Sequence, residues 1–299
     1  MDLRIFKKRL VYIVAFLSFF SASVGAASAS IFSEIRFEKP SKDSVIKILA
    51  IGNSFSDDAL EHYLYGLAKA GGYKVIIGNL YIGGAPLDLH VKNVQEDKEV
   101  YEYRKVNVDG SKQKLPKISI SKALADENWN YISFQQASPK SGVFETYVEP
   151  LPILFKYVKE RAKDPKVKFV WHQTWAYAQN STHNGFATYN KDQMRMYNAI
   201  AEASSKVKTL APIDIVVPAG TAIQNARTKL GDVMTRDGYH LDLNVGRYTA
   251  SCTWYEAIFK QNVVGNLYKP EKLSGADALI AQKAARKGVK KPYKVSRIK

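Results

Sequence analysis

The chain has 299 residues, of which 46% are apolar, 24% charged and 12% aromatic. This composition excludes a disordered chain, a coiled coil and a collagen-like or disulfide-rich scaffold, and the length suits one large domain with a sizeable core. The sole cysteine, Cys252, excludes an intrachain disulfide and a cysteine-cluster zinc site.

Residues 1–29 have the three-part pattern of a secretory signal peptide. A basic start at residues 4–9 precedes an apolar run at residues 10–20, and Ala27-Ser28-Ala29 is typical of a cleavage site. A membrane anchor is the alternative, but this run is shorter than the roughly 20 residues that a spanning helix needs. We expect cleavage after residue 29, a secreted or periplasmic protein, and no stable membrane insertion afterwards.

The net charge of +16 is concentrated near the C-terminus. Without residues 1–29 the charge is +13, of which residues 269–299 carry +8. We expect a domain at residues 30–268 followed by a solvated, partly frayed basic tail at 269–299. Attraction of the tail to an acidic polymer or a membrane surface is the alternative. Its one aromatic residue, Tyr293, gives little support for base stacking, so no nucleic-acid partner is expected.

Short apolar segments rich in β-formers alternate with helical patterns along the chain. Strands are predicted at residues 46–51, 74–82, 131–135, 168–171 and 215–218. Helices are predicted after the first strand, at about 145–162 and at 192–210. The alternation indicates an α/β three-layer sandwich with a central parallel sheet of about five strands. Asp109-Gly110 lies in the stretch 95–120 that breaks this alternation, and it predicts a small inserted hairpin.

A candidate nucleophile follows the first predicted strand. In open parallel sheets, ligands bind at the carboxyl ends of the strands, and here that end continues into Gly52-Asn53-Ser54-Phe55-Ser56. A serine on a tight turn between a strand and a helix is exposed at the sheet edge, close to helix N-terminal N–H groups. The alternative is that Ser54 or Ser56 only caps the helix.

A candidate base lies near the other end of the chain, in Asp237-Gly238-Tyr239-His240. An aspartate three residues before a histidine can accept a hydrogen bond from one imidazole nitrogen, which leaves the other nitrogen free to act as a general base. A surface turn with a chance pair is the alternative, since Asp-Gly is also a turn signal. Together with Ser54, this pair predicts a triad in the chain order Ser–Asp–His.

With these motifs the chain resembles the SGNH (GDSL-like) hydrolase superfamily, in particular its exported Bacteroides-type members of undefined substrate. Residues 52–56 resemble the family's first block, with Asn53 for the usual Asp and Phe55 for Leu. Residues 79–84 are similar to the second block, whose last glycine, here Gly84, gives a backbone N–H to the oxyanion hole. Asp237 and His240 match the fifth block. The resemblance spans about residues 45–262 and implies a flavodoxin-like SGNH fold.

The third block departs from the family pattern. Where a G-x-N-D sequence is usual, the chain has Phe134-Gln135-Gln136-Ala137-Ser138. A glutamine amide carries the same NH₂ donor as asparagine, so Gln136, or else Gln135, could complete the oxyanion hole. The alternative is that both glutamines satisfy buried backbone groups at the strand end.

Other polar and aromatic residues follow the fourth and fifth strands. Of these, His172 and Trp175, with Gln135, are substrate-binding candidates, although Trp175 could equally belong to the core. Residues 224–227 are interpreted as a polar loop that could contact substrate. His62, His90, His172 and His183 have no acidic or cysteine partner at a metal-ligand spacing, so neither a metal site nor a cofactor is expected.

The sequence therefore predicts a secreted serine esterase. Ser54 would be the nucleophile, His240 the base and Asp237 its orienting partner, with Gly84 and Gln136 at the oxyanion. Family habit and export favour a small-molecule or glycan ester as substrate, in particular an O-acyl (acetyl) group on a carbohydrate. The alternative is an inactive SGNH scaffold that binds glycan or associates with the envelope. The sequence does not indicate the oligomeric state.

Overall fold

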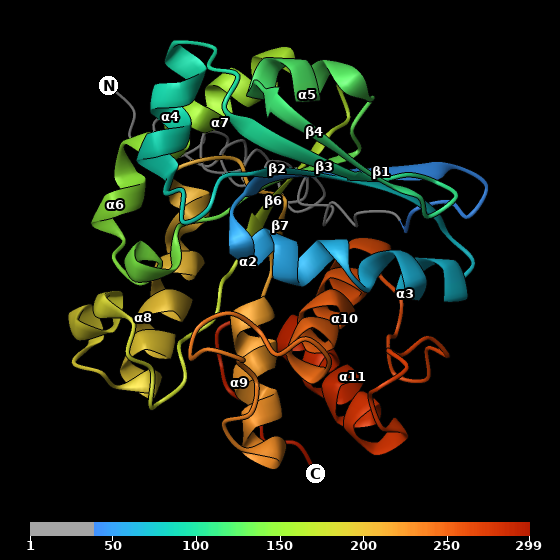
Figure 1. The fold of residues 1–299 in the computed structure, drawn as a ribbon, viewed down its shortest axis with the longest axis vertical. Helices are drawn as coiled ribbons and strands as arrows, with labels where there is room; N and C mark the ends of the chain where they lie inside the picture. Colours follow the sequence, from blue (N-terminus) through green and yellow to red (C-terminus); the bar gives the residue numbers. More distant parts are fainter. Residues whose placement is uncertain (1–38) are drawn as a thin grey trace, which may run out of the picture. The chain divides into compact units, whose positions relative to one another are not determined.

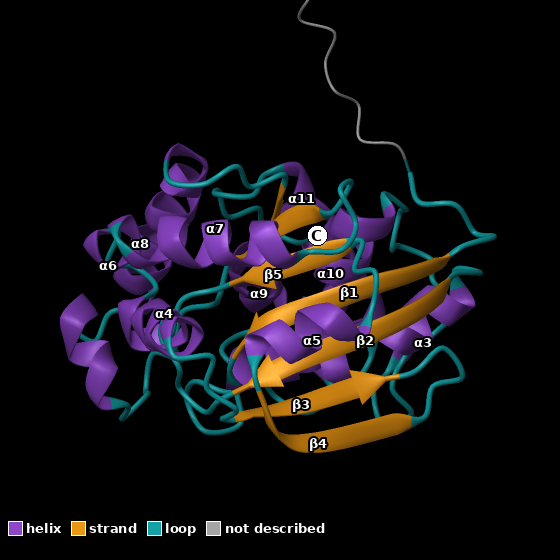
Figure 2. Cartoon of the chain, turned by 90° about the horizontal axis from the view of Figure 1, so that it is seen from above, coloured by secondary structure: helices purple, strands orange, loops and turns teal. Residues whose placement is uncertain are grey.

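The structure is a computed structural model that describes residues 39–299, and in this part of the chain seven strands form one sheet. The strands are β1 (Val45–Gly52), β2 (Lys74–Tyr81), β3 (Tyr101–Val106), β4 (Lys112–Ile118), β5 (Tyr131–Phe134), β6 (Lys168–His172) and β7 (Ile215–Val217). Their order is β4-β3-β2-β1-β5-β6-β7. The five strands β2, β1, β5, β6 and β7 pair in parallel, whereas β3 pairs antiparallel with β2 and with β4. The predicted parallel sheet and inserted hairpin are confirmed (Figure 2).

The parallel strands are apolar because helices cover both faces of the sheet. The last five residues of β1 and all four of β5 are buried. The edge strand β4 differs: six of its seven residues are exposed, and it contains three lysines and Pro116. Charge and proline on an edge strand discourage pairing with another chain, so the hairpin closes this side of the sheet.

Helices connect the strands, and irregular helical turns flank several of them. The helices are α2 (Ser54–Ser56), α3 (Leu64–Ala70), α4 (Leu87–Gln95), α5 (Ile120–Asp126), α6 (Glu145–Val148), α7 (Pro150–Arg161), α8 (Gln193–Lys206), α9 (Ala219–Leu230), α10 (Val245–Phe259) and α11 (Gly275–Lys290). The short turns are η1 (Asp57–Glu61), η2 (Ser138–Lys140), η3 (Asn184–Tyr189) and η4 (Val207–Thr209).

The helices and the sheet form three layers, as predicted. Helices α4, α5 and α7 lie on one face of the sheet, and α3, α9 and α10 lie on the other (Figure 1). Each interface has its own apolar cluster, with Trp129 and Phe134 on the first side and Trp175 and Trp254 on the second. Helix α10 is apolar almost all round and twelve of its fifteen residues are buried, which places it inside the second layer.

The basic C-terminal segment is not the solvated tail that its charge indicated. Residues Gly275–Lys290 form α11, which packs on α9 and α10 through a stripe of small side chains. The buried members of this stripe are Ala278, Ala281, Ala284, Ala285 and Gly288. The chain after α11 is also held, because the backbone N–H of Ile298 donates to Thr228 Oγ1 at 2.9 Å. The prediction from charge alone was wrong because the lysines and arginines occupy the outer side of an amphipathic helix, whose other side is buried.

Two other sequence expectations have different outcomes. Residues 224–227 do not form a loop but the buried middle of α9, where Asn225 Nδ2 donates to the carbonyl of Ala284 at 3.2 Å.

The predicted signal peptide at residues 1–29 lies outside the described residues. Within residues 39–299, no helix is long and apolar enough to cross a membrane.

The close packing of α11 against α9 predicts that a side chain at Gly288 destabilises the fold. A Cβ atom there would lie 3.2 Å from both Cβ and backbone N of Ala222, tighter than ordinary van der Waals contact. Overpacking of this kind costs about 1–3 kcal/mol, so Gly288→Val should lower the melting temperature by several degrees. Gly275→Ala, at a position open to solvent, is the control and should melt like the wild type. Equal melting of both variants would contradict the packing role of α11.

Candidate active site

The carboxyl edge of the sheet collects the turns that follow the parallel strands. Strand β1 lies between β2 and β5, so the chain leaves toward opposite faces on its two sides, which is the switch point where ligands bind in such sheets. Gly52 ends β1, and a Cβ atom there would lie 2.4 Å from Ser56 Oγ. Glycine at this position therefore permits the tight turn that carries Ser54 to the sheet edge.

The side chain of Asn53 holds three segments together at this edge. Its Oδ1 accepts from the backbone N–H of Phe55 at 3.0 Å and so caps α2. The same oxygen accepts from Gln135 Nε2 after β5 at 2.7 Å, and Asn53 Nδ2 donates to the carbonyl of Ala85 after β2 at 3.0 Å. Asn53, rather than Ser54 or Ser56, is thus the helix cap, which leaves the Ser54 hydroxyl free for another partner.

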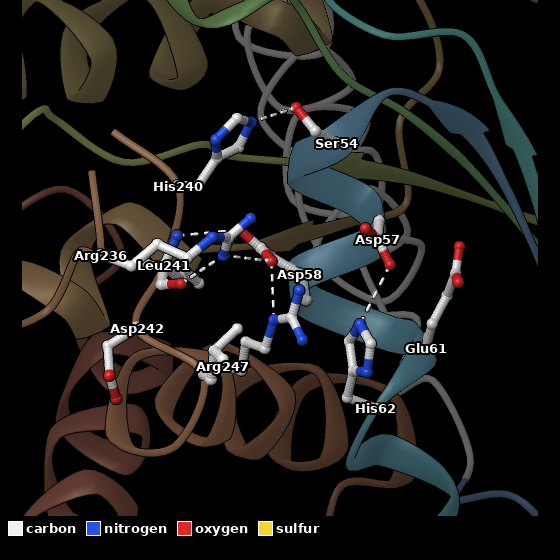
Figure 3. A network of polar contacts seen from close by, with 12 residues as sticks. Ser54, Asp57, Asp58, Glu61, His62, Arg236, His240, Leu241, Asp242 and Arg247 are labelled. Carbon is white, nitrogen blue, oxygen red and sulfur yellow. Dashed lines mark hydrogen bonds and ion pairs between the residues drawn. The ribbon is translucent and has the colours of Figure 1, made fainter. Parts of the chain in front are cut away.

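That partner is His240. Ser54 Oγ lies 3.0 Å from His240 Nε2, and His240 Nδ1 lies 2.7 Å from Asp237 Oδ2 (Figure 3 shows the first of these contacts). The three residues predicted from two motifs far apart in the sequence are therefore linked by consecutive hydrogen bonds. The Asp237 contact favours the tautomer with the proton on Nδ1, in which Nε2 can accept the hydroxyl proton of Ser54.

A tight loop sets the geometry of Asp237 and His240. The backbone N–H of Arg236 donates to the carbonyl of His240 at 2.9 Å, which closes the loop, and Gly238 at its tip has a φ of 90°. Asp237 Oδ1 accepts from the backbone N–H of His240 at 2.8 Å. Burial acts to raise the pKa of Asp237, but the hydrogen bonds from His240 and the loop backbone outweigh burial and lower it. Asp237 is therefore a carboxylate at neutral pH.

Ser54 and His240 line a cavity of about 280 Å³. Gly84, with a φ of 66° in the turn after β2, lines the same cavity. The remaining wall consists of Asn53, Phe55, Tyr81, Gly83, Ser138, Pro139, His183 and Tyr239. Three aromatic rings, two backbone glycines and a second imidazole thus surround the serine.

The two glutamines do not occupy the place predicted for an oxyanion donor. Gln136 is fully buried, and its Nε2 donates to the carbonyl and hydroxyl oxygens of Thr146 at 3.1 and 3.0 Å. Gln135 uses its Nε2 on Asn53 and its Oε1 on His172. Neither residue lines the cavity. Gln136 also accepts from the backbone N–H groups of Leu87 and Ala137, which is the alternative that the sequence left open, whereas the partners of Gln135 are side chains.

Two further substrate-binding candidates belong to the core. His172 is 1% exposed, its Nδ1 contacts Gln135 Oε1 at 3.0 Å, and burial lowers its pKa to about 3. Trp175 is fully buried, stacks on Phe55 at 4.2 Å between ring centroids, and donates from Nε1 to the carbonyl of Tyr239 at 2.8 Å. Trp175 therefore supports the active-site wall from behind and does not face a substrate.

Sequence reasoning missed the aromatic wall of the cavity. His183 and Tyr239 pack edge to face at 4.7 Å, and Tyr239 lies 4.1 Å from the ring of His240. Burial and the neighbouring His240 lower the pKa of His183. The available signals were the position of Tyr239 inside the Asp-x-x-His motif and that of Tyr81 inside the second block, residues 79–84. His183 lies in a segment without a recognisable motif.

A second polar cluster lies along η1, beside a larger cavity of about 510 Å³ that Ser54 does not line. Asp57 pairs with His62 at 3.0 Å and with Arg104 at 3.4 Å. Glu61 accepts from Asn79 Nδ2 at 2.5 Å. Burial and the nearby charge of Asp57 raise the pKa of Glu61 to about 7. Ser54, His240 and Gly84 all line the smaller cavity, so it is the candidate active site.

The fold and the site define an α/β protein with a Ser–His–Asp arrangement at the switch point of its sheet. Its sequence matches a family described as Domain of unknown function (DUF4886) over residues 47–288. The solved structure of a DUF4886 family protein from Bacteroides uniformis is 50% identical, with a TM-score of 0.84 and with 85% of this chain and 98% of that chain covered. The chain therefore belongs to the DUF4886 family.

Other solved structures are more distant. A candidate SGNH hydrolase from Slackia heliotrinireducens is 18% identical with a TM-score of 0.49, and the match covers 72% of this chain and 99% of that chain. An acetylxylan esterase from Geobacillus stearothermophilus is 12% identical with a TM-score of 0.43, with 71% and 94% covered. At identities and TM-scores this low, the activities of these proteins cannot be assigned to this chain. A search of curated proteins found no match.

The partly buried Glu61 predicts that the protein loses stability as the pH rises. Its pKa rises from an ordinary value of 4.5 to about 7 on folding, so the folded state holds the proton more tightly and the free energy of unfolding falls as the pH rises from about 4.5 to 7. Glu61→Gln removes this titration and keeps an acceptor for Asn79. Between pH 5 and pH 8, the melting temperature of the wild type should therefore fall by several degrees more than that of Glu61→Gln.

The control for this measurement is Glu160→Gln. The Glu160 side chain is 56% exposed at the end of α7. Its variant should follow the wild-type profile of melting temperature against pH. Parallel profiles for the wild type and Glu61→Gln would contradict the burial of a titrating carboxyl at Glu61.

Proposed function

We propose that the protein is a serine esterase in which Ser54, His240 and Asp237 form the catalytic triad. The observation that carries the proposal is the pair of contacts at His240, 3.0 Å to Ser54 Oγ and 2.7 Å to Asp237 Oδ2. Both distances are within the reach that general base catalysis requires. The cavity of about 280 Å³ next to Ser54 gives an acyl group access to the nucleophile.

The reaction follows from these contacts in two halves. Ser54 Oγ attacks the acyl carbonyl carbon while His240 Nε2 takes the hydroxyl proton, and Asp237 stabilises the imidazolium that forms. The tetrahedral intermediate then loses the alcohol, whose oxygen receives the proton from His240. In the second half a water molecule attacks the acyl-serine with His240 again as base, which releases the carboxylic acid and restores Ser54.

Backbone groups would stabilise the oxyanion. The N–H of Ser54, in the first turn of α2, and the N–H of Gly84, in the turn after β2, belong to the residues that line the cavity. Two donors of this kind are sufficient for an oxyanion hole, and each contributes about two to three orders of magnitude to the rate. The mechanism therefore does not require a glutamine amide, since both are engaged elsewhere.

The substrate we propose is a short O-acyl ester, such as an acetyl group on a carbohydrate, outside the cytoplasm. A cavity of about 280 Å³ walled by Pro139 and tyrosine rings has room for a short acyl chain and not for a long lipid. Aromatic rings with polar edges, as in Tyr81 and Tyr239, suit the mixed apolar and polar faces of a sugar. Export follows from the signal peptide pattern at residues 1–29.

The second candidate function is a glycan-binding protein on an inactive scaffold. One observation favours it: no glutamine amide reaches the cavity in place of the usual third oxyanion donor. The two candidates differ in the reactivity of Ser54, which can be measured without knowing the substrate.

A fluorophosphonate probe should label Ser54 in the wild-type protein, because His240 can take its proton. Ser54→Ala should not be labelled, and hydrolysis of 4-nitrophenyl acetate should fall at least 10³-fold in Ser54→Ala and in His240→Ala. The double variant should be little worse than either, since the two residues act as one unit. Mass spectrometry of the labelled peptide checks the position.

The matched control is Ser138→Ala. Ser138 is the other serine that lines the cavity, and its Oγ lies 2.8 Å from the hydroxyl of Tyr177 and not from an imidazole. The probe should still label this variant at Ser54. A wild-type protein that resists the probe would exclude the esterase and favour the binding function.

The size of the cavity predicts a preference for short acyl chains. With a series of 4-nitrophenyl esters, kcat/KM should be highest for acetate or propionate and at least 10-fold lower for octanoate. Tyr81→Ala should narrow this difference, because it removes one wall of the cavity. Equal turnover of octanoate and acetate would contradict the proposed substrate class.

A further inference from the structure

A buried carboxylate joins the segment of the nucleophile to the loop of the base. Asp58 lies four residues after Ser54, at the second position of η1, and is 0% exposed. Its Oδ2 accepts from the backbone N–H of Leu241 at 2.8 Å, and its Oδ1 accepts from Arg236 Nη1 at 3.1 Å. These two partners flank His240 in sequence on either side (Figure 3).

Asp58 has a third charged or polar partner, which lies in α10. Arg247, in α10, donates from Nε to Asp58 Oδ1 at 2.7 Å. Arg236 Nη1 also donates to the carbonyl of Leu241 at 2.5 Å, which ties the two ends of the loop to each other. The charge of Asp58 is thus balanced by two guanidinium groups, and both of its oxygens have donors.

The loop at residues 236–241, called the catalytic loop below, depends on hydrogen bonds and ion pairs from neighbouring segments. Asp237 is 39% exposed, so little packing restrains its carboxylate, whereas His240 is 19% exposed and packs against Tyr239. On one side the loop is held from the segment after β6, where the N–H of Ala178 donates to Gly238 and Trp175 donates to Tyr239. On the other side the polar contacts come from Asp58, in the same helical segment as Ser54.

We propose that Asp58 is a positioning residue, which sets the separation of Ser54 and His240 by holding the catalytic loop to the helical segment that carries the nucleophile. A buried ion pair gives little net stability over an apolar replacement, because desolvation offsets its Coulomb energy. What the carboxylate provides is direction: its hydrogen bonds fix the backbone of Leu241 and the side chain of Arg236. Displacement of a catalytic group by about 1 Å can lower a rate about 100-fold.

The test compares Asp58→Asn with a matched variant, Glu256→Gln. Glu256 in α10 is a largely buried carboxylate, with its side chain 11% exposed, that accepts from a backbone N–H (Val263, 2.6 Å) and pairs with an arginine (Arg286, 3.6 Å). Both substitutions are expected to lower the melting temperature. Only Asp58→Asn should lower kcat for 4-nitrophenyl acetate, at least 10-fold with KM within about two-fold, and slow fluorophosphonate labelling equally.

Hydrogen exchange gives a readout that does not depend on catalysis. In Asp58→Asn the amides of residues 236–241 should exchange faster than in the wild type, whereas Glu256→Gln should leave this segment unchanged. Because the kinetic part rests on the proposed function, a wild-type protein that does not react with the probe would refute that function, and exchange alone would then decide the role of Asp58. If the amides of this loop exchange in Asp58→Asn at the same rate as in the wild type, the positioning role is overturned.

A second variant covers the case in which Asp58→Asn does not fold. The Arg236 side chain is 32% exposed, so Arg236→Gln removes the loop's ionic partner and leaves the buried carboxylate paired with Arg247. It should show the same loss in kcat and the same faster exchange, to a smaller extent. Unchanged kcat together with unchanged exchange in Arg236→Gln would also refute the proposal.

Discussion

The hydrogen bonds of the Asn53 side chain join the ends of three parallel strands. This one amide caps the helix that begins at Ser54, accepts from Gln135 after β5, and donates to the turn after β2 that contains Gly84. The amide is 2% exposed, so its polar atoms have no access to bulk water and must be paired within the protein. The orientation of the Ser54 hydroxyl toward its cavity follows from this pairing.

The second constraint is that His240, the proposed base, comes from a part of the chain distant from Ser54. Ser54 and His240 are 186 residues apart, and the loop of His240 follows α9, beyond the last strand of the sheet. A parallel sheet brings strand ends to one edge but does not set the position of a loop beyond the last strand. Polar contacts from Asp58 and from the segment after β6 do so here, which explains why buried charged groups lie within an otherwise apolar layer.

The departures from expectation have a common physical cause. Gln136, His172 and Trp175 follow strands at the active edge, so their place in the sequence suggested a place in the cavity. Each is buried, and Gln136 Nε2, His172 Nδ1 and Trp175 Nε1 each contact a neighbouring protein group. The expectation of a solvated tail at residues 269–299 was wrong in the opposite direction, because small apolar residues among its lysines form the buried side of α11. In both cases the decisive partner belongs to another element, which local sequence cannot reveal.

Local patterns were sufficient for the strands, the hairpin and the two motifs of the site. Apolar runs of four to eight residues and an Asp-Gly turn depend on short-range geometry, and so does the hydrogen bond between Asp237 and His240, three residues apart. The 3.0 Å contact of His240 with Ser54, the walls of the cavity, the covering of α9 by α11, and the partners of Asp58 were decided only by tertiary structure. These features join residues that are distant in sequence, and their energy depends on burial and direction, which exist only once the chain has folded.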